Sequence, residues 1–148
     1  MKIFVKEDNE LLETEVTIRC NIYDKKIEKL KKHIEEFSLA IQGTKEGEQY
    51  KLPLKEIYYM EVVDGRTYIY TENEMYNSNQ SLANLEKILI GSTFVRVSKT
   101  VLLNVDCLKA VAPMENHRML ATLKNEEKII IGRTYISGLK EKLQEGLQ

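Results

Sequence analysis

Two different repeats of apolar and polar residues follow one another at the start of the chain. Ile3-Phe4-Val5 is a short apolar run, and Val16, Ile18 and Cys20 then alternate with polar neighbours, as in a half-buried strand. From Asp24 onward the apolar positions are three or four residues apart, at Ile27, Leu30, Ile34, Phe37 and Ile41. This spacing predicts an amphipathic helix of about four turns that begins after Asp24 as its N-cap. Residues 1–44 are therefore expected to form a small ββα extension.

Three packing partners are open for the apolar stripe of this helix. The stripe can pack over the two strands of its own segment as a small α/β layer. It can pair with the same helix of a second copy, because its spacing also suits a helix–helix seam. It can also dock a regulatory partner. A stripe of two heptads is too short for a stable coiled coil by itself, which favours packing within the segment.

Short β-type runs dominate the chain after the polar turn at residues 43–47. The predicted strands are residues 50–54, 57–63, 67–71, 74–77, 94–97, 101–104, 109–112, 119–123 and 128–131. Asp64-Gly65 and Glu72-Asn73 supply hairpin turns, and residues 124–127 form the last hairpin loop. One short helix follows Ser81 as its N-cap, and another covers residues 135–147. Residues 45–148 are therefore expected to form one domain.

This domain is predicted to be mainly β (α+β overall), with short antiparallel sheets and two short helices. The chain has 148 residues, of which 43% are hydrophobic and 30% charged, which is typical of a globular protein. The formal net charge of -1 excludes a polybasic chain that holds nucleic acid or anionic lipid by bulk charge alone.

The location of the protein is expected to be cytoplasmic. No apolar run approaches the roughly 20 residues that a membrane span needs, and residues 1–7 are charged too early for a signal peptide. Cys20 and Cys107 both lie in apolar runs, so they are expected to be core residues rather than a disulfide.

The sequence contains no recognisable catalytic or metal-binding motif. His33 and His117 have no cysteine or carboxylate at metal-ligand spacing, and the chain has no glycine-rich phosphate loop or nucleophile motif. We therefore expect no catalytic residue, metal, cofactor or small-molecule substrate.

Three strand ends each place a basic residue beside a small hydroxylated one. Arg66-Thr67 follows the first hairpin turn, Ser98-Lys99 follows the strand at 94–97, and Arg133-Thr134 follows the isoleucine-rich strand at 128–131. Loops of this kind contact phosphates and base edges of DNA. Basic residues also flank strands on ordinary surfaces, so these residues alone leave open a β-rich protein–protein interaction module that does not bind DNA.

Four runs resemble, in the same order, the motifs of the LytTR DNA-binding domain of bacterial transcription regulators. Residues 52–61 resemble its I-x-Y-I/F-E strand, and residues 81–86 its S/T-L-x-x-L-E helix. Residues 94–104 match its F-x-R-v-H-R-S-y-l-V-N core position by position, and residues 129–135 are similar to its closing i-x-v-S-R-x-Y. The resemblance covers residues 50–147.

The resemblance implies an elongated LytTR-type fold whose loops enter two successive major grooves and the minor groove between them. It assigns DNA binding to the loop residues Arg66, Thr67, Ser98, Lys99, Arg133 and Thr134, and to Arg96 of the core motif. Ser98-Lys99 stands where the family commonly has His-Arg, so Lys99 offers a point charge instead of a bidentate fork. Gly132 stands where the family has a serine.

Two further residues that the family keeps have alternative roles. Arg96 alternates with Val95 and Val97, so it is expected to point outward, toward either a DNA phosphate or a surface carboxylate. Asn104 lies at a strand end, where it can satisfy backbone groups instead of binding a ligand.

The expected function is that of a sequence-specific, double-stranded DNA-binding transcription regulator. A second protomer is expected on the operator, because a single small module buries too little surface for tight binding. Residues 1–44 are too few for the receiver domain that often precedes a LytTR domain. The chain is therefore similar to the small LytTR regulators, which implies a membrane protein that restrains it.

Overall fold

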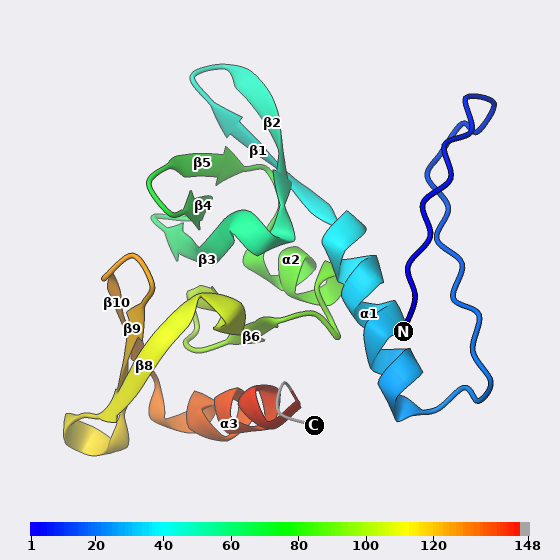
Figure 1. Ribbon diagram of the computed structural model, residues 1–148. Coiled ribbons are helices and arrows are strands. Elements are labelled where there is room, and N and C mark those ends of the chain that lie inside the picture. Colours follow the sequence, from blue (N-terminus) through cyan, green and yellow to red (C-terminus); the bar gives the residue numbers. More distant parts are fainter. Residues whose placement is uncertain (146–148) are drawn as a thin grey trace. The chain divides into compact units, whose positions relative to one another are not determined.

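The computed structural model describes residues 1–145 of the chain (Figure 1). Its α-helices are α1 (Lys25–Ser38), α2 (Leu82–Ile88) and α3 (Ile136–Glu145). Its strands are β1 (Ala40–Lys45), β2 (Glu48–Pro53), β3 (Ile57–Val63), β4 (Arg66–Thr71), β5 (Met75–Ser78), β6 (Phe94–Arg96), β7 (Val101–Asn104), β8 (Leu108–Pro113), β9 (Met119–Leu123) and β10 (Lys128–Ile131). Leu147, in the predicted last helix, lies outside the described residues. Across residues 1–145, every helix is too short or too polar to span a bilayer.

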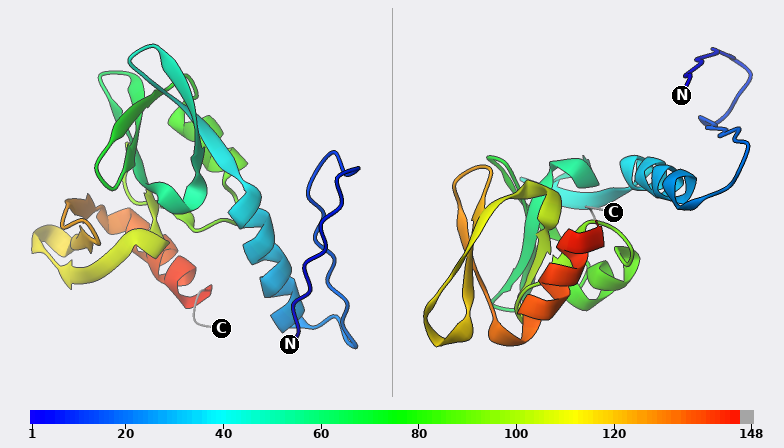
Figure 2. Two further views of the ribbon diagram at one scale, coloured as in Figure 1. Left: turned by 45° about the horizontal axis from the view of Figure 1, so that its top comes forward. Right: turned by 60° about the horizontal axis from the view of Figure 1, so that its bottom comes forward.

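The strands form two antiparallel sheets. Seven strands follow the order β2-β1-β5-β4-β3-β7-β6, and the other three follow the order β10-β9-β8. Figure 2 shows the smaller sheet, coloured yellow to orange, next to α3. The predicted mainly β architecture with two short helices is confirmed for the second part of the chain. Ser81 caps α2 as predicted, because its Oγ accepts a hydrogen bond from the Asn84 amide at 3.1 Å.

Two hydrophobic cores lie on opposite faces of the larger sheet. One contains Leu82, Leu85 and Leu89 from the α2 region together with inward-facing residues of β3 and β4. The other joins the larger sheet to the smaller sheet and to Leu139 of α3. In β7, Leu102 belongs to the first core, whereas Val101 and Leu103 belong to the second. A strand that is buried on both faces has a continuous apolar sequence, which explains the run Val101-Leu102-Leu103.

The strand β1 was not predicted, because Ile41 continues the spacing of the helix stripe. The helix α1 ends at Ser38, and Ile41 is instead buried in β1 as part of the first core. Gly43 explains why β1 packs so closely: a Cβ there would lie 2.8 Å from Leu52 Cδ1 and 2.9 Å from Tyr76 Cβ. Because β1 pairs with both β2 and β5, the large sheet begins before the boundary expected between residues 44 and 45.

The expected strands at the start of the chain are absent. The chain divides into two compact units after Ile34, and the first contains no strand: residues 3–5 and 16–20 are extended but unpaired. The side chains of Ile3 and Val5 are 83% and 93% exposed, so the expected packing of the helix over these strands is wrong. An alternating pattern selects which side chains would face a core, but a strand also needs a partner strand in register, and among residues 1–145 these stretches have none. Only the helix and its cap are confirmed, since Asp24 Oδ1 accepts a hydrogen bond from the Ile27 amide.

The two cysteines differ in accessibility. Cys107 is buried as expected, and burial raises the pKa of its thiol to about 11. Cys20 was also expected in a core, but it is exposed because the strand that would bury it does not form.

We therefore expect one thiol of the native protein to react quickly with iodoacetamide at neutral pH and the other only after unfolding. Peptide mapping by mass spectrometry should find the fast label on Cys20. Urea should make both sites reactive. Equal labelling of both thiols in the native protein would contradict the burial of Cys107.

Candidate nucleic-acid interface

The three predicted loops lie at one end of the two sheets. In the first contact, the Val62 amide donates a hydrogen bond to the Thr100 carbonyl oxygen at 2.9 Å, which joins the β6–β7 loop to the end of β3. In the second, the Gly132 amide donates to the Val97 carbonyl oxygen at 2.8 Å, which joins the chain after β10 to the same β6–β7 loop. Strands that are far apart in sequence therefore bring Arg66, Lys99 and Arg133 to the same end of the domain. We call it the basic end, defined by these three residues.

The cations of the basic end are available to a ligand. Arg66, Lys99 and Arg133 are exposed, and among residues 1–145 they form no salt bridge. An exposed guanidinium or ammonium group without an internal carboxylate partner keeps its charge and its hydrogen-bond donors for a bound anion.

Local structure determines how each cation is presented. Asp64 and Gly65 both have positive φ, 51° and 76°, as in the tight hairpin turns that connect twisted strands, so Arg66 follows directly after the turn. Ser98 Oγ accepts a hydrogen bond from the Thr100 amide at 3.1 Å and closes the loop around exposed Lys99.

Arg133 begins a short 3₁₀ helix, Arg133–Tyr135, that leads into α3. The preceding residue is Gly132, at which a Cβ would lie 3.2 Å from Tyr135 Cδ2. A serine at this position would require the tyrosine ring to shift by a few tenths of an ångström. The close ring contact gives a packing reason for glycine where the LytTR motif has serine.

The other predicted site residues differ in their exposure. Thr134 is exposed, whereas Thr67 is only 6% exposed and lies in β4 opposite Ser78. Arg96 is partly buried and already has partners: its Nη1 lies 3.1 Å from Glu86 Oε2, and its Nε donates to the Ser98 carbonyl oxygen at 3.2 Å. Of the two alternatives for Arg96, the structure has the surface carboxylate.

Asn104 satisfies backbone groups, as one of its two predicted roles requires. Its side chain is 1% exposed, and its Nδ2 donates to the carbonyl oxygen of Ile57 at 2.8 Å. Its Oδ1 accepts from Thr93 Oγ1 at 2.7 Å and from the Asp106 amide at 3.1 Å. It lies at the far end of β7 from Lys99, inside the domain.

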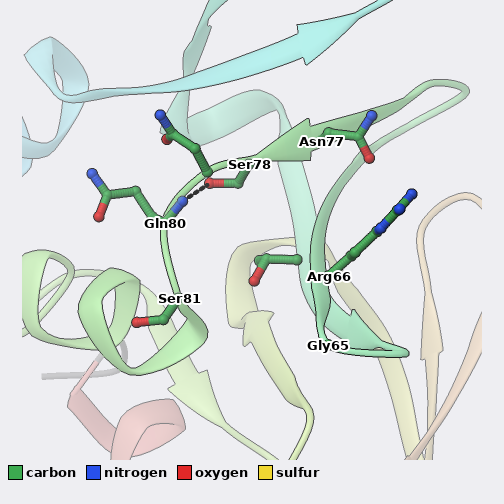
Figure 3. A pocket seen from close by; sticks show the side chains of 8 residues that line it. Gly65, Arg66, Asn77, Ser78, Gln80 and Ser81 are labelled. Carbon is green, nitrogen blue, oxygen red and sulfur yellow. Dashed lines mark hydrogen bonds between the residues drawn. The ribbon is translucent and has the colours of Figure 1, made fainter.

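Sequence reasoning missed a row of amide and hydroxyl side chains beside Arg66. The segment from the end of β5 to the cap of α2 is Asn77-Ser78-Asn79-Gln80-Ser81, and it borders an open pocket of about 390 Å³ together with Gly65, Arg66 and Thr67 (Figure 3). Ser78 Oγ accepts a hydrogen bond from the Gln80 amide at 3.1 Å, which bends this segment around the pocket. Asparagine and glutamine side chains suit adenine edges. The consecutive polar residues could have indicated this segment from sequence.

The loop between β8 and β9 lies beside the basic end, which the sequence analysis did not predict. Met119 pairs with Pro113 on one side and Ile131 on the other, so the loop lies beside Gly132. Asn116 and His117 have positive φ values of 61° and 62°, a strained conformation that is common where loops bind ligands. His117, Arg118 and Lys140 of α3 border an open pocket of about 590 Å³. Arg118 has no neighbouring Ser or Thr, so it does not fit the pattern of a basic residue beside a hydroxylated one that predicted the other loops.

The opposite ends of the strands carry carboxylates. Asn125 Nδ2 donates to the Glu72 carbonyl oxygen at 3.0 Å, so the β4–β5 turn meets the β9–β10 loop there. These two connections contain Glu72, Glu74, Glu126 and Glu127, and we call this end the acidic end. Lys45 pairs with Glu74 and Lys109 pairs with Glu126 at this end, so part of its negative charge is neutralised within the domain.

Shifted pKa values occur toward the acidic end. Burial raises the pKa of Tyr59, and the nearby Glu127 carboxylate raises it further. The Tyr59 ring stacks on Tyr70 with centroids 4.4 Å apart, and burial also raises the pKa of Tyr70. Both phenols are neutral at physiological pH, so they act as packing groups. Among residues 1–145, no three His, Cys, Asp or Glu side chains gather as metal ligands do.

Known proteins with similar sequences include sensory transduction proteins of Bacillus species. The chain is 30% identical over 132 residues to the sensory transduction protein LytT of Bacillus anthracis, covering 81% of this chain and 54% of that protein. It is 32% identical over 89 residues to LytT of Bacillus subtilis, covering 60% of this chain and 37% of that protein. The chain thus spans about half the length, or less, of these relatives.

A solved structure has the same fold. It is the LytTr DNA-binding domain of a Bacillus cereus protein described as a methyl-accepting/DNA response regulator. The TM-score is 0.66 at 23% sequence identity, and the match covers 70% of this chain and 95% of that domain. The family model of the LytTr DNA-binding domain matches residues 47–144, which contain both sheets except β1. The chain therefore belongs to the LytTR DNA-binding domain family.

Proposed function

We propose that this chain is a transcription regulator that binds double-stranded DNA with the basic end. The observation that carries the proposal is the convergence of exposed Arg66, Lys99 and Arg133 at one end of a LytTR-family domain, with no carboxylate partner among residues 1–145. Cations on neighbouring strand ends suit the phosphates and groove edges of a duplex.

The side chains of the basic end divide into those that touch DNA and those that shape the loops. Arg66 and Arg133 have planar forks for guanine edges in the grooves, whereas Lys99 suits a phosphate. Exposed Thr134 adds a hydroxyl donor. Ser98 and Arg96 hold the β6–β7 loop through the hydrogen bonds described above, and buried Thr67 holds the start of β4.

The test is selection of bound duplexes from random DNA, followed by titration of the selected site at several salt concentrations. A regulator of this kind should enrich one sequence, and its affinity should fall with a slope of about 0.9 log units per log salt for each phosphate contacted. A protein–protein interaction module predicts the opposite outcome: no enriched sequence and little dependence of DNA binding on salt.

Two protomers are expected on one operator. Single modules bury only about 600–1,000 Å² of protein surface on DNA, which is little for tight binding at physiological salt. Half-sites should therefore be one or two helical turns apart, and inserting half a turn should abolish joint occupancy because it rotates one site to the opposite face of the duplex. Footprinting on spacing variants measures this. Unchanged joint occupancy at half-turn spacing would contradict the paired arrangement.

A further inference from the structure

Residues 1–34 form a unit that buries none of its side chains. Within it, Ile18, Ile27, Leu30 and Ile34 are partly covered, and every other side chain is exposed. The arm before α1 exposes several large apolar side chains: Ile3, Phe4, Val5, Leu12 and Val16. Large apolar side chains that are exposed close together mark a surface that associates with another protein. The cysteine of this unit, Cys20, is unpaired.

The backbone of the arm forms only local hydrogen bonds among residues 1–145. The Leu11 amide donates to the Asp8 carbonyl oxygen, the Glu10 amide to Asp8 Oδ1, and the Asp24 amide to the Ile22 carbonyl oxygen. The extended stretches 3–7 and 14–20 therefore have no ladder, although Val16, Ile18 and Cys20 alternate with polar residues as in a half-buried strand. An extended apolar segment with free amides is a template for pairing with another strand.

The charges of the unit indicate which chain covers it. Residues 7–15 contain five carboxylates and no basic residue: Glu7, Asp8, Glu10, Glu13 and Glu15. Residues 25–32 of α1 contain five lysines and one glutamate: Lys25, Lys26, Glu28, Lys29, Lys31 and Lys32. Each copy thus carries an acidic arm and a basic helix. Two copies related by a two-fold axis can match these charges twice in one isologous interface.

We propose that residues 1–34 are a homodimer interface. The arm of each copy lays its apolar side chains against the partly covered stripe Ile27, Leu30 and Ile34 of the other copy, and the extended stretches pair as intermolecular strands. Apolar contact supplies the stabilisation, and the acidic and basic segments set the orientation. This interface would join the two protomers proposed on the operator, but it forms without DNA.

The oligomeric state of the full chain tests the proposal in the absence of DNA. Sedimentation velocity over a concentration series should find a dimer. The variant Val5→Asp should raise the dimer dissociation constant by about tenfold or more, because the change places a charge in the interface. Val5 is 93% exposed in the single chain, so the variant should unfold like the wild type at concentrations at which both are monomeric. The matched control is Ile90→Asp, which changes a 79% exposed isoleucine outside the unit and should leave the dimer intact.

Hydrogen exchange tests the strand pairing. Amides of residues 3–7 and 14–20 should be protected at high protein concentration and lose protection on dilution. A monomeric wild type, a Val5→Asp variant that remains a dimer, or a dimer with unprotected arms would each overturn the proposal. A wild-type dimer that fails to bind any selected duplex would instead contradict the proposed DNA binding and leave the interface standing.

Discussion

Replacing Asn104 with alanine is expected to lower the free energy of unfolding by about 3 kcal/mol. The side chain is buried, and its hydrogen-bond partners include the Ile57 carbonyl, which is distant in sequence. Its amide nitrogen donates a hydrogen bond to the Ile57 carbonyl oxygen, and its amide oxygen accepts hydrogen bonds from the Thr93 hydroxyl and the Asp106 amide. Removing it leaves these groups without a partner inside the domain, where the loss of each hydrogen bond is costly. Urea denaturation followed by circular dichroism measures the effect.

The matched control is Asn84→Ala on the exposed surface of α2. Asn84 Nδ2 donates only to Gln80 Oε1 at 3.3 Å, so its loss should cost less than about 0.5 kcal/mol. Equal stability of the Asn104 and Asn84 variants would show that Asn104 does not hold the β6–β7 hairpin to β3. It would also reopen a ligand-binding role for this residue.

The double variant Arg66→Ala/Arg133→Ala is expected to lose about 2–6 kcal/mol of specific DNA binding, or roughly 30-fold to 10⁴-fold in affinity. In the proposed complex, each arginine would present two parallel donors to a guanine edge, and an alanine at either position would offer none. Both side chains are exposed, so the thermal stability of the variant should match that of the wild type. Titrations on the selected site and on a scrambled duplex measure the loss of specificity.

Two single variants separate base recognition from simple charge. Lys99→Ala should weaken binding to selected and scrambled duplexes evenly, and it should reduce the salt slope by about 0.9 because one phosphate contact is lost. Lys124→Ala removes the same charge beside the acidic end, where the Lys124 amide bonds to the Cys107 carbonyl, and it should bind like the wild type. A double arginine variant that keeps wild-type specificity would refute the assignment of the basic end as the reading surface.

Much of the candidate site could be predicted from sequence because loop chemistry is local. The Asp64-Gly65 turn, the Ser98 loop and the start of α3 each follow a β-type run that is visible in the sequence. The residues that were missed lie where no local pattern marks them. Arg118 and the segment 77–81 join the basic end only because β9 and β5 run beside strands that carry the other loops.

Local patterns gave wrong predictions at two places, where the packing partners of the segment differ from those that its pattern suggests. Ile41 fits the helix spacing, but it lies in β1, because Gly43 allows that strand to approach Leu52 and Tyr76 closely. The stretches 3–5 and 16–20 have strand-like alternation without a strand, since a ladder needs a second chain segment in register.

The sequence by itself determined the order and type of elements from residue 48 onward, the capped helices and the family. Those features depend on periodicity, turn residues and short motifs, which are properties of neighbouring residues. Only the tertiary structure decided which cations have a carboxylate partner within the domain and which do not. It also decided which polar side chain is buried and bonded to the backbone. Arg96 is paired with Glu86 and Asn104 is enclosed, whereas Arg66, Lys99 and Arg133 share one exposed end. Whether a cation is paired or exposed depends on contacts between strands that are distant in sequence, so it cannot be predicted from one segment alone.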